Sequence, residues 1–218
     1  AVMRKNYQKQ VEDLGPLQQG EVVADLGFSS IRPALSPDGR YLAYLGTRTR
    51  HYGPHLLVLR ELESGEEEVL DGGVSSSLSW SPDSRRLLYV KKGKADKYGS
   101  RQADIYEYDL DGRESGLATK LLWTVPAVVG GFAPEAAKVR RLSHGLRAFY
   151  PAYSPDARHI AFVHNQGSSN NLGIMNADGT GVRYLTDFAA GTQLYTPQWS
   201  PDGSHLVFSV SRQGQRDI

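Results

Sequence analysis

Side chains that could perform catalysis or hold a metal are present in this chain, but not at the spacing that such chemistry needs. The sequence has six histidines and no cysteine, which excludes disulfides and thiolate metal sites. His51 and His55 are four residues apart, but Gly53 and Pro54 lie between them and exclude the helix that would bring both imidazoles to one metal. There is no Gly-x-Ser-x-Gly nucleophile elbow, His-Glu-x-x-His zinc motif or Gly-x-x-x-x-Gly-Lys phosphate loop. We therefore expect a protein that is not an enzyme and that has no catalytic residue, metal or cofactor.

The net charge argues against nucleic acid as a partner, and the distribution of apolar residues argues against a membrane span. The chain of 218 residues has 25 Lys and Arg against 24 Asp and Glu, a formal net charge of +1, whereas a dedicated nucleic-acid binder carries a clear basic excess. No run of 18 apolar residues occurs, so we expect no segment that spans a membrane. Together with the missing catalytic motifs, this indicates a binding scaffold.

A short motif recurs along the chain and predicts the elements that would carry binding residues. Ser-Pro-Asp begins at Ser36, Ser81, Ser154 and Ser200, so the spacings are 45, 73 and 46 residues. A propeller blade of four short strands takes about 40–45 residues, and the long gap is one blade plus about 28 more.

Each copy of the motif is expected to be a surface turn between two strands. Its serine and proline suit the first two positions of a type I turn. The fourth position varies, so we expect no obligatory positive φ there; its residues are Gly39, Ser84, Ala157 and Gly203. The runs that follow are rich in Val, Tyr, Phe and Ile, as strands prefer; they are residues 41–45, 87–90, 159–163 and 205–209.

A second hairpin follows in each complete unit. Its first strands are expected at residues 55–62, 104–110 and 172–176, and Ser-Gly or Asp-Gly turns follow them. One unit is therefore four antiparallel strands, called a to d. The prediction is an all-β propeller with about four blades, of which the last is truncated.

The run Trp199–Gly203, with the apolar strand after it and the Asp-Gly hairpins, resembles the repeat of the TolB propeller family. The same repeat occurs in the propellers of prolyl oligopeptidase-like and tricorn-like peptidases. The resemblance covers about residues 20–218. Resemblance to TolB implies a periplasmic or otherwise extracytoplasmic protein-interaction module of a bacterium. Resemblance to the peptidases implies the alternative, an accessory propeller that gates or docks substrate for a catalytic domain outside this chain.

Two segments fall outside the repeat. Residues 1–19 are expected to form an N-terminal helix or linker, and residues 20–218 the propeller blades. Residues 115–138 are an insertion that contains Trp123 and Phe132, either a long loop folded back on its blade or a protruding contact element. The chain ends where the third strand of blade four should start, so we expect a longer parent protein.

Strand direction alternates within a blade, so the b–c and d–a loops share one face of the disc. The b–c loops are basic and the c–d turns are acidic, which predicts two faces of opposite charge and steering of an acidic protein partner to the b–c face. The alternative is that these cations only solubilise the loops. The predicted contact residues are Lys91, Lys92, Lys94, Lys97, Arg101, Arg48 and Arg50, with Trp123 and Phe132 from the insertion.

Overall fold

The structure is a computed structural model that describes residues 29–47, 55–75, 77–93, 97, 99–111, 138–212 and 215–218. The expected N-terminal helix or linker and nearly all of the insertion at 115–138 lie outside the described residues.

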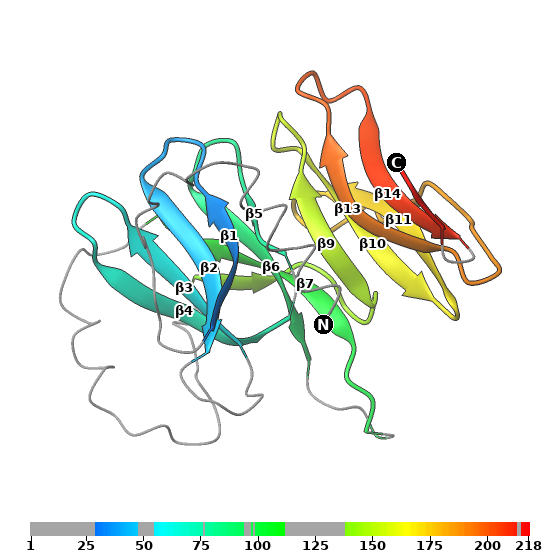
Figure 1. Cartoon of the computed structure of the whole chain (residues 1–218), viewed down its shortest axis with the longest axis horizontal. Coiled ribbons are helices and arrows are strands. Elements are labelled where there is room, and N and C mark those ends of the chain that lie inside the picture. The colour runs from blue at the N-terminus through cyan, green and yellow to red at the C-terminus, as the bar shows by residue number, and fades with distance from the viewer. Residues whose placement is uncertain are drawn as a thin grey trace, which may run out of the picture.

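The described residues form four successive units of antiparallel strands, which are the blades (Figure 1). Blade 1 contains β1 (Ser29–Leu35), β2 (Tyr41–Thr47), β3 (His55–Glu61) and β4 (Glu67–Val74). Blade 2 contains β5 (Ser79–Trp80), β6 (Arg86–Lys92), β7 (Ala103–Asp109) and β8 (Val139–Arg141). Blade 3 contains β9 (Ala148–Tyr153), β10 (His159–Gln166), β11 (Ser169–Asn176) and β12 (Arg183–Tyr184). Blade 4 contains β13 (Gln193–Trp199), β14 (Leu206–Arg212) and β15 (Gln215–Asp217).

Within each blade every strand pairs with the next one along the chain, as the repeat predicts. The all-β propeller fold is thereby confirmed. In blade 4, β15 pairs with β14, so the third strand of that blade has begun before the last residue. Blades 1 and 2 are also joined by one bridge, between Val74 and Lys91.

The b strands β6 and β10 are buried on both faces because blades 2 and 3 are each stacked between two neighbours. In β10, Ile160 and Phe162 belong to the apolar cluster shared with blade 2, whereas Val163 belongs to the cluster shared with blade 4. This explains why the b strands are continuously apolar in sequence rather than alternating.

Contacts between neighbouring blades are polar as well as apolar. The innermost strands β1, β5, β9 and β13 touch one another in chain order. The indole N–H of Trp80 donates to the carbonyl of Ala34 at 2.9 Å, and that of Trp199 donates to the carbonyl of Ala152 at 3.1 Å. Tyr153 occupies the matching position in blade 3, and its hydroxyl donates instead to the buried carboxylate of Glu107. In blades 2, 3 and 4 the large residue before the motif serine therefore bonds its blade to the preceding blade.

The Ser-Pro-Asp turns differ from the prediction. The fourth residue has positive φ in all four copies: 73° at Gly39, 61° at Ser84, 58° at Ala157 and 71° at Gly203, so the expectation of no obligatory positive φ is wrong. A type I turn needs a left-handed residue after it to return the chain into the next strand with the correct twist.

The turns lie at the surface, as expected, because the proline and aspartate of each copy are exposed, but their serines are structural. Ser36 is buried, and its hydroxyl donates to Asp38 at 2.5 Å while it accepts the amide N–H of Tyr41 at 2.8 Å. Ser84, the left-handed residue of the second turn, accepts the amide N–H of Asp38 from blade 1 at 3.1 Å. This contact between blades helps to hold a serine where glycine would be less strained.

Candidate ligand-binding pocket on the b–c face

A pocket of about 570 Å³ opens at the end of the molecule where the b strands finish and the c strands start. In Figure 1 the a–b turns lie along the top of the view, and the ends of the b strands point to the bottom. Blades 2, 3 and 4 contribute to the wall, and the lining side chains are Lys92, Ser100, Arg101, Gln102, Ala103, Arg147, Phe149, Tyr150, Asn165, Asn170, Gln193 and Tyr195. We call this the b–c pocket.

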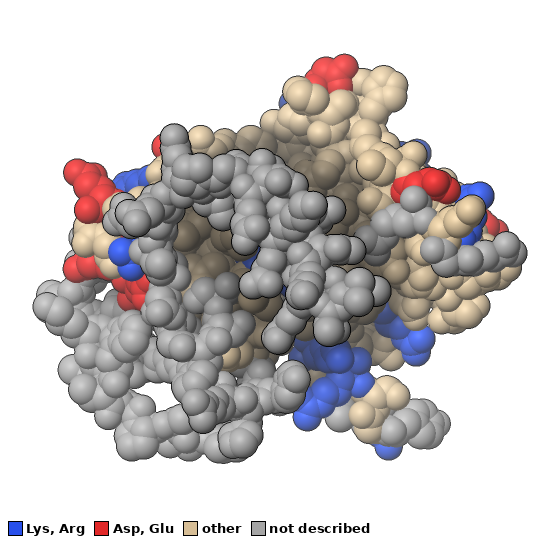
Figure 2. Space-filling view, in the orientation of Figure 1, with Lys and Arg blue, Asp and Glu red and all other residues tan. Residues whose placement is uncertain are grey.

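The lining of the b–c pocket contains three cations and no acidic residue. Lys92 ends β6, Arg101 precedes β7 and Arg147 precedes β9. The Arg147 guanidinium donates through Nε to Oε1 of Gln102 at 2.8 Å, which orients it. Figure 2 shows Lys and Arg side chains gathered below β6 and β7, whereas acidic side chains lie elsewhere: at the left, by the β3–β4 turn, at the top and at the right. The pocket therefore favours a ligand that carries negative charge.

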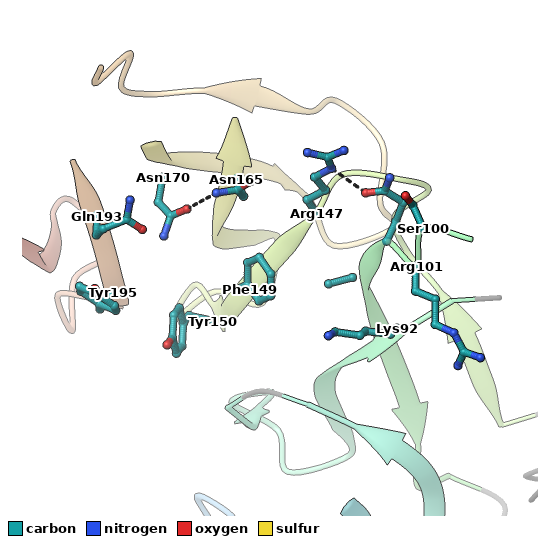
Figure 3. A pocket seen from close by; sticks show the side chains of 12 residues that line it. Lys92, Ser100, Arg101, Arg147, Phe149, Tyr150, Asn165, Asn170, Gln193 and Tyr195 are labelled. Carbon is teal, nitrogen blue, oxygen red and sulfur yellow. Dashed lines mark hydrogen bonds between the residues drawn. The ribbon is translucent and has the colours of Figure 1, made fainter. Parts of the chain in front are cut away.

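Three aromatic rings also line the pocket. Phe149 and Tyr150 come from β9 and Tyr195 from β13. The rings of Tyr150 and Tyr195 meet edge to face, with centroids 6.3 Å apart and planes at 64°. Figure 3 shows Phe149 and Tyr150 in the middle of the pocket, with Lys92 and Arg101 on one side.

Carboxamides form the other side of the pocket (Figure 3). Asn165 donates through Nδ2 to Oδ1 of Asn170 at 2.9 Å, across the β10–β11 hairpin. The Nε2 of Gln193 donates to the carbonyls of Ser168, at 2.8 Å, and Gly191, at 3.2 Å. These bonds fix the carboxamides before a ligand arrives, so binding loses little side-chain entropy.

The innermost strands of blades 1, 3 and 4 carry a repeated strained bulge, which lies at the pocket in blades 3 and 4. Arg32, Tyr150 and Thr196 have φ of 55°, 51° and 44°, and each precedes a proline. The strand register shifts at each of these sites. Positive φ costs a non-glycine residue of order 1–3 kcal/mol, and such strain clusters at functional sites.

A second cavity of about 120 Å³ lies between the innermost strands of blades 2, 3 and 4. Tyr150 and Thr196 line it, and Tyr150 also lines the b–c pocket. The bulge therefore places one tyrosine between the two cavities.

The structure describes four of the predicted contact residues, and they have different surroundings. Lys92 and Arg101 line the b–c pocket, and Lys97 is exposed near it. Lys91 is only partly exposed: its ammonium lies 2.7 Å from Oδ1 of Asp71, which is 0% exposed and belongs to blade 1. Its charge is neutralised at the seam between two blades, so Lys91 is a structural residue. Lys94, Arg48, Arg50, Trp123 and Phe132 lie outside the described residues.

The c–d turns are acidic in sequence, but part of that charge is paired. Glu67 accepts Arg60 at 2.9 Å and the hydroxyl of Tyr44 at 3.1 Å, whereas Glu63 and Glu66 are exposed. The contrast between the two faces is therefore smaller than the sequence predicts.

Sequence reasoning missed most of the pocket, including Arg147, Phe149, Tyr150 and Tyr195. A signal was available, because a proline stands three residues before the motif serine in three of the four copies: Pro33, Pro151 and Pro197. Proline in an inner strand at a fixed blade position is typical of a bulge.

A serine, a histidine and an aspartate meet at the fourth Ser-Pro-Asp turn, but not as a catalytic relay. The Ser204 hydroxyl lies 2.7 Å from Oδ2 of Asp202 and 2.6 Å from Nδ1 of His205. A triad needs the carboxylate to orient the histidine while the histidine takes the serine proton. Here the serine donates to the carboxylate, and hydrogen bonds from Ser200 and then from Ser204 hold the pKa of Asp202 below its usual value.

The described residues were also compared with what a metal site and a membrane-spanning helix require. Within them, no group of three or more His, Asp or Glu side chains converges as a metal site would require. The part of the chain that the structure describes also contains no helix long and apolar enough to cross a membrane.

Known proteins share this architecture, although no protein-family model matches the chain. YuxL, an uncharacterised peptidase of Bacillus subtilis, is 31% identical over 134 residues, which cover 61% of this chain and 16% of YuxL. The Tol-Pal system protein TolB of Anaeromyxobacter dehalogenans is 28% identical over 150 residues, or 68% of this chain and 28% of TolB. A solved structure named as a TolB, from Agrobacterium tumefaciens, is 25% identical with a TM-score of 0.62, over 86% of this chain and 57% of that one.

This chain is a β-propeller of TolB-type repeats, and it also resembles the propellers of peptidases. A prolyl endopeptidase structure shares the fold, with a TM-score of 0.54 at 16% identity. The chain spans 16% and 28% of the length of the two curated relatives named here, and 57% of the solved TolB-named structure.

Proposed function

We propose that this chain is a non-catalytic protein-interaction propeller of an extracytoplasmic bacterial protein, and that its b–c face docks an acidic partner protein. The similarity to TolB, a Tol-Pal system protein, supports the interaction role and the location. The observation that carries the proposal is the composition of the b–c pocket, with Lys92, Arg101 and Arg147 and no acidic lining residue.

Surface charge of one sign affects mainly the rate at which two proteins associate. A one-sign patch steers a partner of opposite charge, raises the association rate and makes binding depend on salt. Lys92 and Arg101 are exposed at the mouth of the pocket, where they meet a folded partner before deeper groups do. Because surface pairs are individually weak, at about 0–1 kcal/mol, several cations must act together.

The test reverses these charges in the intact chain. A variant with Lys92→Glu, Lys97→Glu and Arg101→Glu is used as bait in extracts of the native host, at low and at moderate salt. Its matched control, Glu63→Lys with Glu66→Lys, changes charge on the c–d turn, where both residues are exposed. We expect the first variant to capture at least tenfold less of the acidic protein than the wild type does, and the control to capture the same amount as the wild type. Equal capture by the two variants at both salt concentrations would overturn the proposal.

A second candidate function is favoured by the similarity to YuxL, which is 31% identical over 134 residues and is named as a peptidase. The propeller would then dock or gate substrates for a catalytic domain of the same polypeptide. The nucleotide sequence around the coding region separates the candidates, because a hydrolase domain in the same reading frame supports the accessory role. In both cases the isolated chain is expected not to hydrolyse peptides.

A further inference from the structure

We propose that the b–c pocket binds an acidic oligosaccharide, a short chain of sugars with carboxylate groups. This small ligand is additional to the partner protein proposed above. Its recognition uses the interior of the pocket, whereas the exposed cations at the mouth serve the partner as well.

The cations define the charged part of the ligand. Lys92, Arg101 and Arg147 come from three separate positions, the end of β6, the segment before β7 and the segment before β9. Three separate cations suit carboxylates spaced along a chain better than one compact anion. Arginine also offers paired N–H donors that match the geometry of a carboxylate.

The carboxamides define the hydroxyl-rich part. Asn165, Asn170, Gln102 and Gln193 all line the pocket. A carboxamide presents both donor and acceptor atoms, and a sugar hydroxyl likewise donates and accepts. The hydrogen bonds from Asn165 to Asn170, and from Gln193 to two backbone carbonyls, hold these groups in place. A polar lining that is oriented before binding rejects ligands that cannot satisfy it.

The rings and the size fit the same ligand. Phe149, Tyr150 and Tyr195 supply apolar faces against which a sugar ring can pack. The volume of about 570 Å³ is within the usual range for ligand pockets and accommodates roughly two or three sugar rings.

An extended peptide bound as an added strand fits less well. The described innermost strands pair on one side only, which leaves an edge toward the centre of the disc. Bulges with a proline interrupt that edge in blades 1, 3 and 4, and β5 of blade 2 has only two residues. Bulges, proline and very short strands are the features by which edges avoid strand addition.

Single-stranded nucleic acid also fits poorly. Its bases bind on flat aromatic platforms on which successive rings stack. Tyr150 and Tyr195 meet edge to face at 64°, so they do not form such a platform. An acidic sugar chain is the ligand that uses the cations, the carboxamides and the rings together.

The test is isothermal titration calorimetry of the intact chain with trigalacturonate as the probe. Maltotriose is the neutral control, and triglutamate is the peptide control of equal charge. We expect trigalacturonate to bind at least tenfold more tightly than either control. Tyr195→Ala and Asn170→Ala should weaken it at least tenfold, and Tyr195→Phe should restore most of the affinity because it keeps the ring. Arg183→Gln, an exposed cation on β12, is the matched control that should change nothing.

Each other outcome counts against the proposal. Equal binding of triglutamate would identify a general anion site, and equal binding of maltotriose would identify a neutral-sugar site. Absence of trigalacturonate binding, with near-ultraviolet circular dichroism that shows a folded chain, would overturn it outright. The proposed docking function is tested separately, because a chain that binds no sugar but still loses its partner on charge reversal keeps that function.

Discussion

Gly179 provides a stringent test of how the blades are stacked. It lies in the c–d turn of blade 3 with φ of +90°, and a Cβ placed there would clash with the backbone oxygen of Leu142 in blade 2. The Leu142 amide is itself held by the carbonyl of Ile105 at 2.9 Å. Gly145 is the natural comparison, since its φ is +74° and a Cβ placed there would have no atom within 4 Å.

The expected cost of Gly179→Ala follows from these two geometries. The left-handed conformation costs an alanine about 1–2 kcal/mol at either site, and the stiffer unfolded chain returns about 0.4–1 kcal/mol. Gly145→Ala should therefore lower the free energy of unfolding by about 1 kcal/mol. Gly179→Ala adds a clash with backbone that cannot rotate away, and overpacking of this kind costs about 1–3 kcal/mol more.

Equilibrium urea denaturation of the wild type and both variants measures this difference. The linear extrapolation gives the free energy of unfolding, and an unchanged slope shows that the same transition is being compared. We expect Gly179→Ala to be the less stable variant by about 2 kcal/mol. Equal stability of the two variants would mean that the c–d turn of blade 3 is not in close contact with the Leu142 backbone of blade 2.

Three further predictions concern turns, protonation and seams. Ala157→Gly should raise the free energy of unfolding by about 1 kcal/mol in the same assay, since φ is +58° there; a loss of stability would contradict the left-handed turn. Burial lowers the pKa of His164, which stacks on Tyr184. The unfolded chain therefore protonates this histidine at a higher pH than the folded chain does, and stability falls as pH drops below about 6.5 toward the folded pKa. His164→Phe should reduce the drop in melting temperature between pH 7.5 and 5.5; an unchanged drop would mean that other groups cause it. Asp71→Asn removes the carboxylate that pairs with the partly exposed Lys91 ammonium at the seam and should cost about 2 kcal/mol, part of which Lys91→Met should recover; a double variant no more stable than the single one would argue against the pair.

The repeat made the fold predictable. Ser-Pro-Asp at blade spacing, with an apolar residue before it and a β-rich run after it, located the b strands to within about three residues. The turn was predicted less well, because the φ of its fourth residue depends on the path into the next strand. Ser84 and Ala157 show that a residue without glycine's freedom takes that conformation when the hairpin requires it.

The candidate site was predictable only in part. Loop charge identified Lys92 and Arg101, which line the pocket, but it also selected Lys91, whose partner Asp71 lies 20 residues earlier in another blade. Arg147 and the three aromatic residues were missed because they belong to d–a segments and inner strands, where the sequence resembles ordinary strand sequence.

The sequence by itself determined the strand order, the antiparallel pairing and the blade as the unit, because these follow from local turn chemistry and from apolar runs that recur at a fixed period. Only the tertiary structure decided which charges reach solvent. Lys91 and Lys92 are neighbours in sequence, yet alternation along β6 turns one toward the carboxylate of blade 1 and the other toward the pocket. The pocket lies between blades, so its composition depends on how the blades stack, and no single repeat encodes it.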